Sequence, residues 1–118
     1  MVESGLTPEP PVALIYATYP TQAAALEQGR QLVEARLAGC VNILPGMTAV
    51  FIWKGQTETA AEAVLLAKLT PDRVTEAIEF LRAGHPYETP AILVLPVTGG
   101  NAAYLDWIRA GCSKQCAP

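Results

Sequence analysis

Val12-Ala13-Leu14-Ile15-Tyr16-Ala17-Thr18 is a short, nearly continuous apolar run that ends at Tyr19-Pro20. An apolar run of this length without polar alternation is typical of a strand that is buried on both faces. Thr21 is a favourable N-cap, and the segment after it repeats its apolar residues near every 3.6 positions as far as Gly39. We therefore predict a buried strand followed by an amphipathic helix.

The middle of the chain predicts a long hairpin. Val41 to Trp53 is rich in β-branched and aromatic residues, and Pro45-Gly46 within it predicts a bend or a bulge. Lys54-Gly55-Gln56-Thr57 has the composition of a hairpin turn. Glu62 to Lys68 then supplies the returning strand, although the Ala-rich stretch Glu58 to Ala63 is equally compatible with a helix.

The rest of the chain predicts a helix, a strand and a last short helix. Thr70-Pro71 is a strong helix start, and that helix stops at Gly84. A loop with two prolines leads into Ala91 to Val97, an apolar run typical of a strand, and Asn101 can cap the final helix. The order β-α-β-β-α-β of the core is the ferredoxin-like arrangement, an α+β sandwich in which two helices cover one face of a four-stranded antiparallel sheet.

The length of 118 residues suits one domain, which we place at residues 12–110 between flexible tails at 1–11 and 111–118. In the ferredoxin-like arrangement one face of the sheet lacks helices, and a short terminal helix cannot cover it alone. Each Val, Leu or Ile left in water there would forgo about 1.5–3 kcal/mol. We therefore expect the chain to associate with copies of itself.

Composition excludes several classes of function. The formal net charge is −3 and the Lys and Arg residues are scattered, which argues against a nucleic-acid partner. No apolar run reaches the roughly 18–20 residues needed to cross a bilayer, so we expect no membrane insertion. The N-terminal residues do not form a secretory signal, and three cysteines do not make a disulfide framework. These observations predict a cytoplasmic location.

Three residues are candidate metal ligands. His85 is the only histidine, and its imidazole suits copper, zinc or nickel. Glu88 could add an oxygen and Cys40 a soft sulfur. The alternatives are that the His85 ring nitrogens cap the preceding helix or bridge to a neighbouring strand, and that Cys40 is a buried, inert thiol. Cys112 and Cys116 have the spacing of a soft-metal clip, but we expect them to lie in a frayed, exposed tail.

A second group of residues could line a ligand cleft. Glu62 and Lys68 are separated by an even number of positions, which places both on one face of a strand. They could bind a polar ligand there, or they could be solvated strand ends. Trp53 and Tyr87 could line the same cleft or pack at subunit contacts, where aromatic residues are enriched. No phosphate-binding loop, nucleophile elbow or zinc-protease motif is present, and we expect no catalytic residues.

Several separated segments together resemble one family, the CutA divalent-cation tolerance proteins. They are Ala17 to Pro20, Leu37 to Gly46, Trp53-Lys54-Gly55, Glu62 to Lys68, His85-Pro86-Tyr87-Glu88 and Tyr104 to Ile108. The resemblance covers about Val12 to Ile108. It implies a ferredoxin-like subunit in a tight homotrimer, with the long hairpin extending onto neighbouring subunits. It also implies a role in tolerance of divalent cations, copper above all, and an architecture similar to that of PII signalling proteins.

One departure from the family pattern bears on a metal site. Ala91 follows Pro90 where the family often has a second Glu, so one carboxylate is missing near His85. Two hypotheses follow. The first is a trimer that binds or responds to copper or another divalent metal ion. The second is a PII-like signalling or scaffold trimer that binds a small molecule or a partner protein in its intersubunit cleft.

Overall fold

A computed structural model describes residues 11–113 of the chain. Its strands are β1 (Val12–Tyr19), β2 (Cys40–Trp53), β3 (Gln56–Leu69) and β4 (Ile92–Val97). Its helices are α1 (Gln22–Glu34), the 3-10 turn η1 (Pro71–Arg73), α2 (Val74–Gly84) and α3 (Ala102–Gly111). Of the predicted tails, 1–11 and 111–118, residues 1–10 and 114–118 lie outside the described residues.

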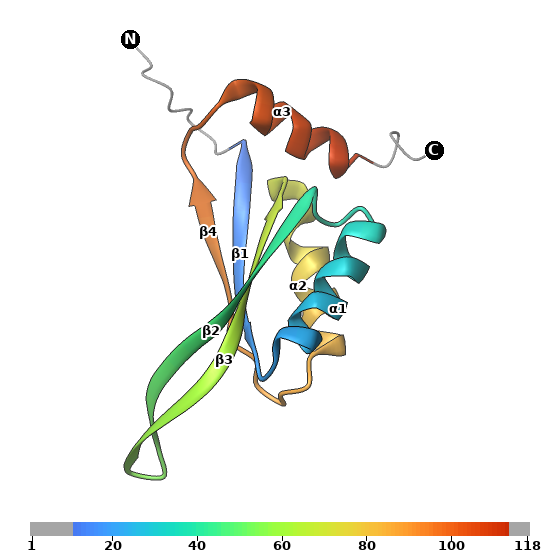
Figure 1. Cartoon of the computed structure of the whole chain (residues 1–118). Coiled ribbons are helices and arrows are strands. Elements are labelled where there is room, and N and C mark those ends of the chain that lie inside the picture. The colour runs from blue at the N-terminus through green and yellow to red at the C-terminus, as the bar shows by residue number, and fades with distance from the viewer. Residues whose placement is uncertain (1–10, 114–118) are drawn as a thin grey trace.

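The strands form one antiparallel sheet in the order β2-β3-β1-β4, and α1 and α2 cover one face of it (Figure 1). This confirms the ferredoxin-like α+β fold. The Thr21 side chain caps α1 by accepting a hydrogen bond from the Ala24 amide, as its position predicted. The Ala-rich segment from Glu58 to Ala63 is strand rather than helix, because all of it pairs with β2 or β1.

The core lies between the sheet and the two covering helices. β1 and β3 direct alternate residues into it, so Ile15, Ala17, Leu65, Ala67 and Leu69 are fully buried. Leu32 of α1 and Leu81 of α2, both fully buried, complete the core from the side of the helices.

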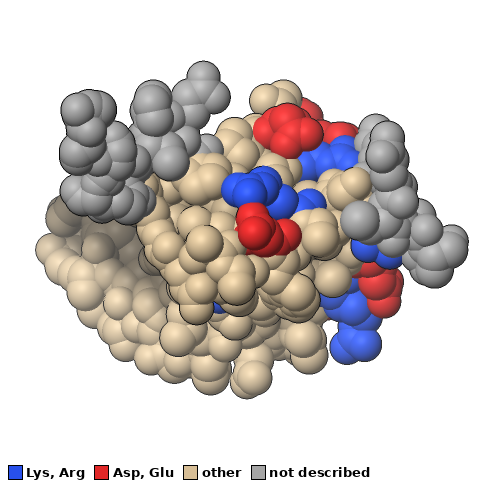
Figure 2. All heavy atoms as spheres, turned by 90° about the horizontal axis from the view of Figure 1, so that it is seen from above, with Lys and Arg blue, Asp and Glu red and all other residues tan. Residues whose placement is uncertain are grey.

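The opposite face of the sheet has no helix layer (Figure 1). The β1–β4 pairs on this face are apolar, since Leu14 faces Leu95 and Tyr16 faces Leu93, whereas β2 and β3 add the polar residues Asn42 and Lys68. Leu93 is 60% exposed and Leu44, on β2, is 48% exposed. Viewed from above, charged side chains gather on one part of the molecule and leave a broad uncharged surface (Figure 2). One face of the sheet is therefore largely apolar and open to solvent in the isolated chain.

The β2–β3 hairpin extends well beyond both helices (Figure 1). Its register shifts between Leu44 and Met47, where Gly46 has a φ of 76°, so the bend predicted at Pro45-Gly46 is a β-bulge. Beyond this bulge the strands pair with each other alone. The hairpin end exposes a row of large apolar side chains: Val50, Phe51, Ile52 and Trp53.

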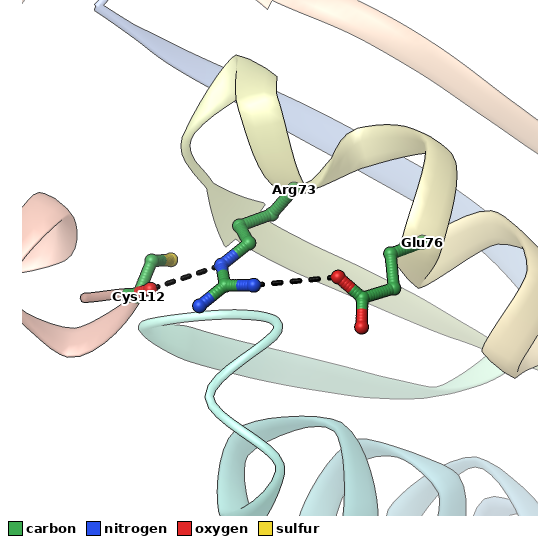
Figure 3. Close-up of polar contacts among 3 residues, drawn as sticks. All are labelled: Arg73, Glu76 and Cys112. Atoms are coloured by element: carbon green, nitrogen blue, oxygen red, sulfur yellow. Dashed lines mark hydrogen bonds and ion pairs between the residues drawn. The ribbon is translucent and has the colours of Figure 1, made fainter. Parts of the chain in front are cut away.

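Helix α3 crosses one end of the sheet and is held at its C-terminal end. The buried Arg73 guanidinium donates from Nε to the Cys112 carbonyl at 3.0 Å and from Nη1 to Glu76 at 3.3 Å (Figure 3). Cys112 itself is only 3% exposed, because it packs into the core cluster. The prediction that Cys112 lies in an exposed, flexible tail is therefore wrong, and the ordered chain extends past residue 110. Cys116 lies outside the described residues.

Candidate functional site

His85 is the C-cap of α2 and begins the loop that leads to β4. Its ring stacks on the Tyr19 ring with 4.2 Å between centroids. Its Nε2 lies 2.8 Å from the Thr18 carbonyl oxygen, and its Nδ1 accepts the Tyr87 backbone N–H at 3.1 Å. Because the carbonyl can only accept and the amide can only donate, the ring is the tautomer that carries its proton on Nε2.

These contacts define the chemistry available to His85. Burial lowers the pKa of the imidazole, and the carbonyl of Thr18 opposes that effect only in part. The lone pair that a neutral imidazole would give to a metal is occupied by the Tyr87 amide. Within one chain, His85 therefore bridges the loop to strand β1, which is the structural alternative considered for it above.

Tyr87 ties the same loop to the hairpin. Its hydroxyl donates to Glu62 Oε2 at 2.7 Å, and its ring lies 5.1 Å from the His85 ring. Burial, followed by the hydrogen bond and charge of Glu62, raises the pKa of Tyr87 to about 12. The hydroxyl is therefore protonated at neutral pH and acts as a donor that fixes the Glu62 carboxylate.

A pocket of about 540 Å³ lies between this loop and the hairpin. It contains three of the four residues predicted for a ligand cleft, together with Glu88 from the predicted metal set. The lining residues are Phe51, Trp53, Ala60, Glu62, Tyr87, Glu88 and Thr89. The pocket thus combines two carboxylates with three aromatic side chains.

Three of the lining residues, Phe51, Ala60 and Thr89, were missed by sequence reasoning, although one signal was available. Phe51 lies two positions before Trp53 on β2, so it shares the strand face of that residue. Thr89 carried no comparable signal, because its place depends on the course of a loop.

Lys68, the fourth predicted cleft residue, lies elsewhere. It pairs with Leu14 and Cys40, and its Nζ donates to the Tyr104 hydroxyl at 2.9 Å. Glu62 and Lys68 share one face as their spacing predicted, but six positions of β3 separate them by about 20 Å. Within one chain, Lys68 therefore lies outside the pocket. Its hydrogen bond to Tyr104 was not predicted.

The three predicted metal ligands do not come together in one chain. Cys40 faces Lys68 on β3, whereas Thr18, the contact of His85, faces Val64. These two positions on β3 are about 13 Å apart. Among residues 11–113, no three His, Cys, Asp or Glu side chains are grouped so that they could hold a metal ion.

Comparison with known proteins identifies the family. The model of the CutA1 divalent ion tolerance protein family matches residues 13–111. The chain belongs to this family. The divalent-cation tolerance protein CutA of Thermus thermophilus is 41% identical over 96 residues, which cover 81% of this chain and 93% of that protein. The human protein CutA is 39% identical over 98 residues, which cover 83% of this chain and 55% of that protein.

Solved CutA structures have the same fold. The T. thermophilus structure superposes with a TM-score of 0.82 at 38% identity, covering 86% of this chain and 99% of that one. CutA from Xylella fastidiosa superposes with a TM-score of 0.84 at 39% identity, covering 86% of this chain and 98% of that one. The chain spans about half the length of the human and mouse CutA proteins it matches, 55% of each.

Other relatives correct the predicted cytoplasmic location. The Arabidopsis thaliana and Oryza sativa CutA proteins are named chloroplastic, and the Archaeoglobus fulgidus structure is described as periplasmic. A domain of this family therefore occurs in several compartments, and its composition and cysteine count do not reveal which. Within the described part of the chain, no helix is long and apolar enough to span a membrane.

Proposed function

We propose that the protein is a homotrimer that acts in tolerance of divalent cations, and that it does so by binding a ligand where subunits meet rather than by catalysis. The observation that carries this proposal is the apolar surface that the chain leaves uncovered. Leu44 and Leu93 on the open sheet face, and Val50 and Ile52 on the hairpin, are all at least 48% exposed. Self-association is the usual way in which such faces are buried.

The subunit number comes from the family resemblance. The resemblance implies a tight homotrimer, in which a hairpin as long as β2–β3 extends onto a neighbouring subunit. Burying each of the large apolar side chains would contribute about 1.5–3 kcal/mol. The open sheet face and the hairpin of each subunit together supply apolar surface for a tight assembly.

The first ligand we propose is a copper-class metal ion shared between subunits. No single chain groups three ligands among its described residues. Cys40 lies on the edge strand β2 and is half-buried, and Glu88 is exposed, so both can meet ligands from another chain. His85 joins such a site only by releasing the Tyr87 amide from its Nδ1.

Isothermal titration with Cu(I), Cu(II) and Zn(II) tests the metal proposal. We expect binding tighter than millimolar, a large loss in Cys40→Ser and Glu88→Gln, and a smaller loss in His85→Ala. Glu58→Gln is a matched control, because Glu58 is exposed on β3 outside the pocket. Wild-type protein that binds none of these ions would contradict the metal proposal while leaving the trimer in place.

A second candidate function is favoured by the pocket between hairpin and loop. Its volume of about 540 Å³ is within the range of small-molecule sites, and Glu62 is held in position by Tyr87. A PII-like signalling or scaffold trimer would use such a cleft for a metabolite. Thermal-shift screening separates the two: stabilisation by small molecules and not by metals supports the second, and the reverse supports the first.

A further inference from the structure

The walls of the pocket between hairpin and loop are of two chemical kinds. Phe51 and Trp53 present aromatic surface, since they are 43% and 60% exposed on the hairpin, and Tyr87 adds a third ring from the loop. Glu62 and Glu88 supply carboxylates, and Thr89 supplies a hydroxyl. None of the seven described lining residues is basic. The pocket therefore offers negative charge beside the electron-rich faces of aromatic rings.

One side of the pocket, formed by Glu62 and Tyr87, is held by contacts within the chain. The Tyr87 hydroxyl holds one oxygen of Glu62 at 2.7 Å, and His85 holds the backbone amide of Tyr87. The His85 ring is in turn stacked on the buried Tyr19 and bonded to β1. This chain of contacts anchors one carboxylate and one ring to the core, so a ligand would not have to order them.

The same walls are poorly suited to a bare metal ion. Divalent cations such as Ca²⁺ or Mg²⁺ take six or more oxygen ligands, whereas this pocket offers two carboxylates and a hydroxyl. Aromatic faces instead attract cations whose charge is spread over carbon-bound groups, because the ring quadrupole is negative on its face. The Trp53 ring already attracts a primary ammonium, since the Lys54 Nζ lies 5.8 Å from its centroid.

We propose that this pocket binds an organic cation, an ammonium group bearing alkyl substituents. The aromatic rings contact the alkyl groups, and Glu62 and Glu88 balance the charge. This inference names the ligand class of the cleft in the proposed function, and it rests on that cleft being open to small molecules in the assembly. Lys54 lies beside the pocket without lining it, so its ammonium competes for the Trp53 ring.

A matched pair of probes tests the inference. Choline carries a quaternary ammonium, and 3,3-dimethylbutan-1-ol has the same shape without the charge. Titration calorimetry on the full chain should give saturable choline binding, on the order of millimolar, and much weaker binding of the alcohol. Trp53→Leu and Glu62→Gln should each weaken choline binding roughly 2- to 30-fold, while Lys54→Met should strengthen it.

Two control variants lie outside the pocket. Trp107→Leu removes an exposed tryptophan from α3, and Glu34→Gln removes an exposed carboxylate from α1. Both should leave choline affinity within twofold. Equal binding of choline and the neutral alcohol, or no saturable choline binding, would overturn the inference. So would binding of Mg²⁺ or Zn²⁺ that is lost in Glu62→Gln while choline does not bind.

Light scattering on the same samples separates this inference from the proposed function. A trimer that fails to bind choline contradicts the ligand class alone. A monomer contradicts the proposed assembly, whatever it binds.

Discussion

The β2–β3 hairpin has two halves that differ in what covers them. The base, Cys40–Leu44 with Val64–Leu69, packs under the helices, and Leu65 and Leu69 are fully buried. The tip, Met47–Trp53 with Gln56–Glu62, continues the same ladder, yet Val50 is 67% and Ile52 66% exposed. The β-bulge between Leu44 and Met47 marks the boundary between the two halves.

The lengths of the elements explain this difference. A 13-residue helix such as α1 spans about 20 Å, whereas a 14-residue strand such as β2 spans about 46 Å. The helices can therefore cover only about half of the hairpin. The β2 strand is apolar in both halves, but in the tip Val50 and Ile52, which alternate with the pocket residues Phe51 and Trp53, must find their cover outside the subunit. The base explains the stability of the fold, and the tip supplies apolar surface for the proposed assembly.

Truncation of the base should have the largest effect. Leu65→Ala removes a fully buried side chain and leaves a cavity, so we expect a loss of about 2–5 kcal/mol in the free energy of unfolding. Urea denaturation at a fixed protein concentration measures it. Leu65→Met, which keeps the volume, should cost less than about 1.5 kcal/mol.

The matched change in the tip should act on assembly. Ile52→Ala should leave the secondary structure of the subunit unchanged and raise the protein concentration at which the assembly dissociates, which light scattering over a dilution series measures. The distinction between the two halves would be wrong if Ile52→Ala lowered the free energy of unfolding as much as Leu65→Ala does and left the assembly intact on dilution.

The next largest effect is expected where α3 meets the start of the base. A Cβ added at Gly39 would lie 2.7 Å from the Ile108 carbonyl oxygen, which is backbone and cannot rotate away. Gly39→Ala should therefore cost about 1–3 kcal/mol through displacement of α3. Gly100→Ala is the control, since its nearest neighbour is 3.7 Å away, and it should be close to neutral. Equal stabilities of the two variants in thermal unfolding would refute the close contact.

A smaller effect is expected for the link between the loop and the hairpin. Tyr87→Phe removes the hydrogen bond to Glu62, which should cost about 0.5–1.5 kcal/mol in urea denaturation. Tyr16→Phe removes a hydroxyl that has no hydrogen bond to any described residue, and it should cost less. If the two variants lose the same stability, the bond to Glu62 contributes nothing measurable.

The smallest effect concerns the protonation of His85. Burial lowers its pKa below the ordinary value of 6.5, so the unfolded chain takes up the proton before the folded one does. The stability from neutral His85 is thus fully present above pH 6.5 and is lost as pH falls through the folded pKa. Because the chain has a single histidine, one imidazole NMR signal reports the titration directly. A pKa above 6.5 would show that the ring is not buried as described.

The sequence was sufficient for the fold because each element has its own local signal. Buried runs such as Val12 to Thr18, the Thr21 cap and the Pro45-Gly46 bend depend on neighbouring residues alone. The Ala-rich stretch Glu58 to Ala63 was ambiguous because its strand form is imposed by pairing with β2, a contact between distant residues.

The site could be predicted only in part for a related reason. Glu62, Tyr87 and Trp53 were identified, and the structure brings them to one pocket. The distance between Glu62 and Lys68 follows from the length of a straight strand, whereas the role of His85 depends on Thr18, which is 67 positions away in the sequence. Its residue type indicated that His85 is a metal ligand. Within one chain, His85 instead forms hydrogen bonds that join the loop to strand β1.

The molar mass in solution is the most direct test of the proposed assembly, because burial between subunits is the role proposed for the open sheet face and for Val50 and Ile52 of the tip. Size-exclusion chromatography with light scattering at micromolar concentration should give about three times the 12.5 kDa mass of the chain. Replacing Val50 and Ile52 with Lys should lower that mass while the circular dichroism of the fold is retained. A wild-type protein that is a stable monomer, with its apolar tip in water, would contradict the central claim.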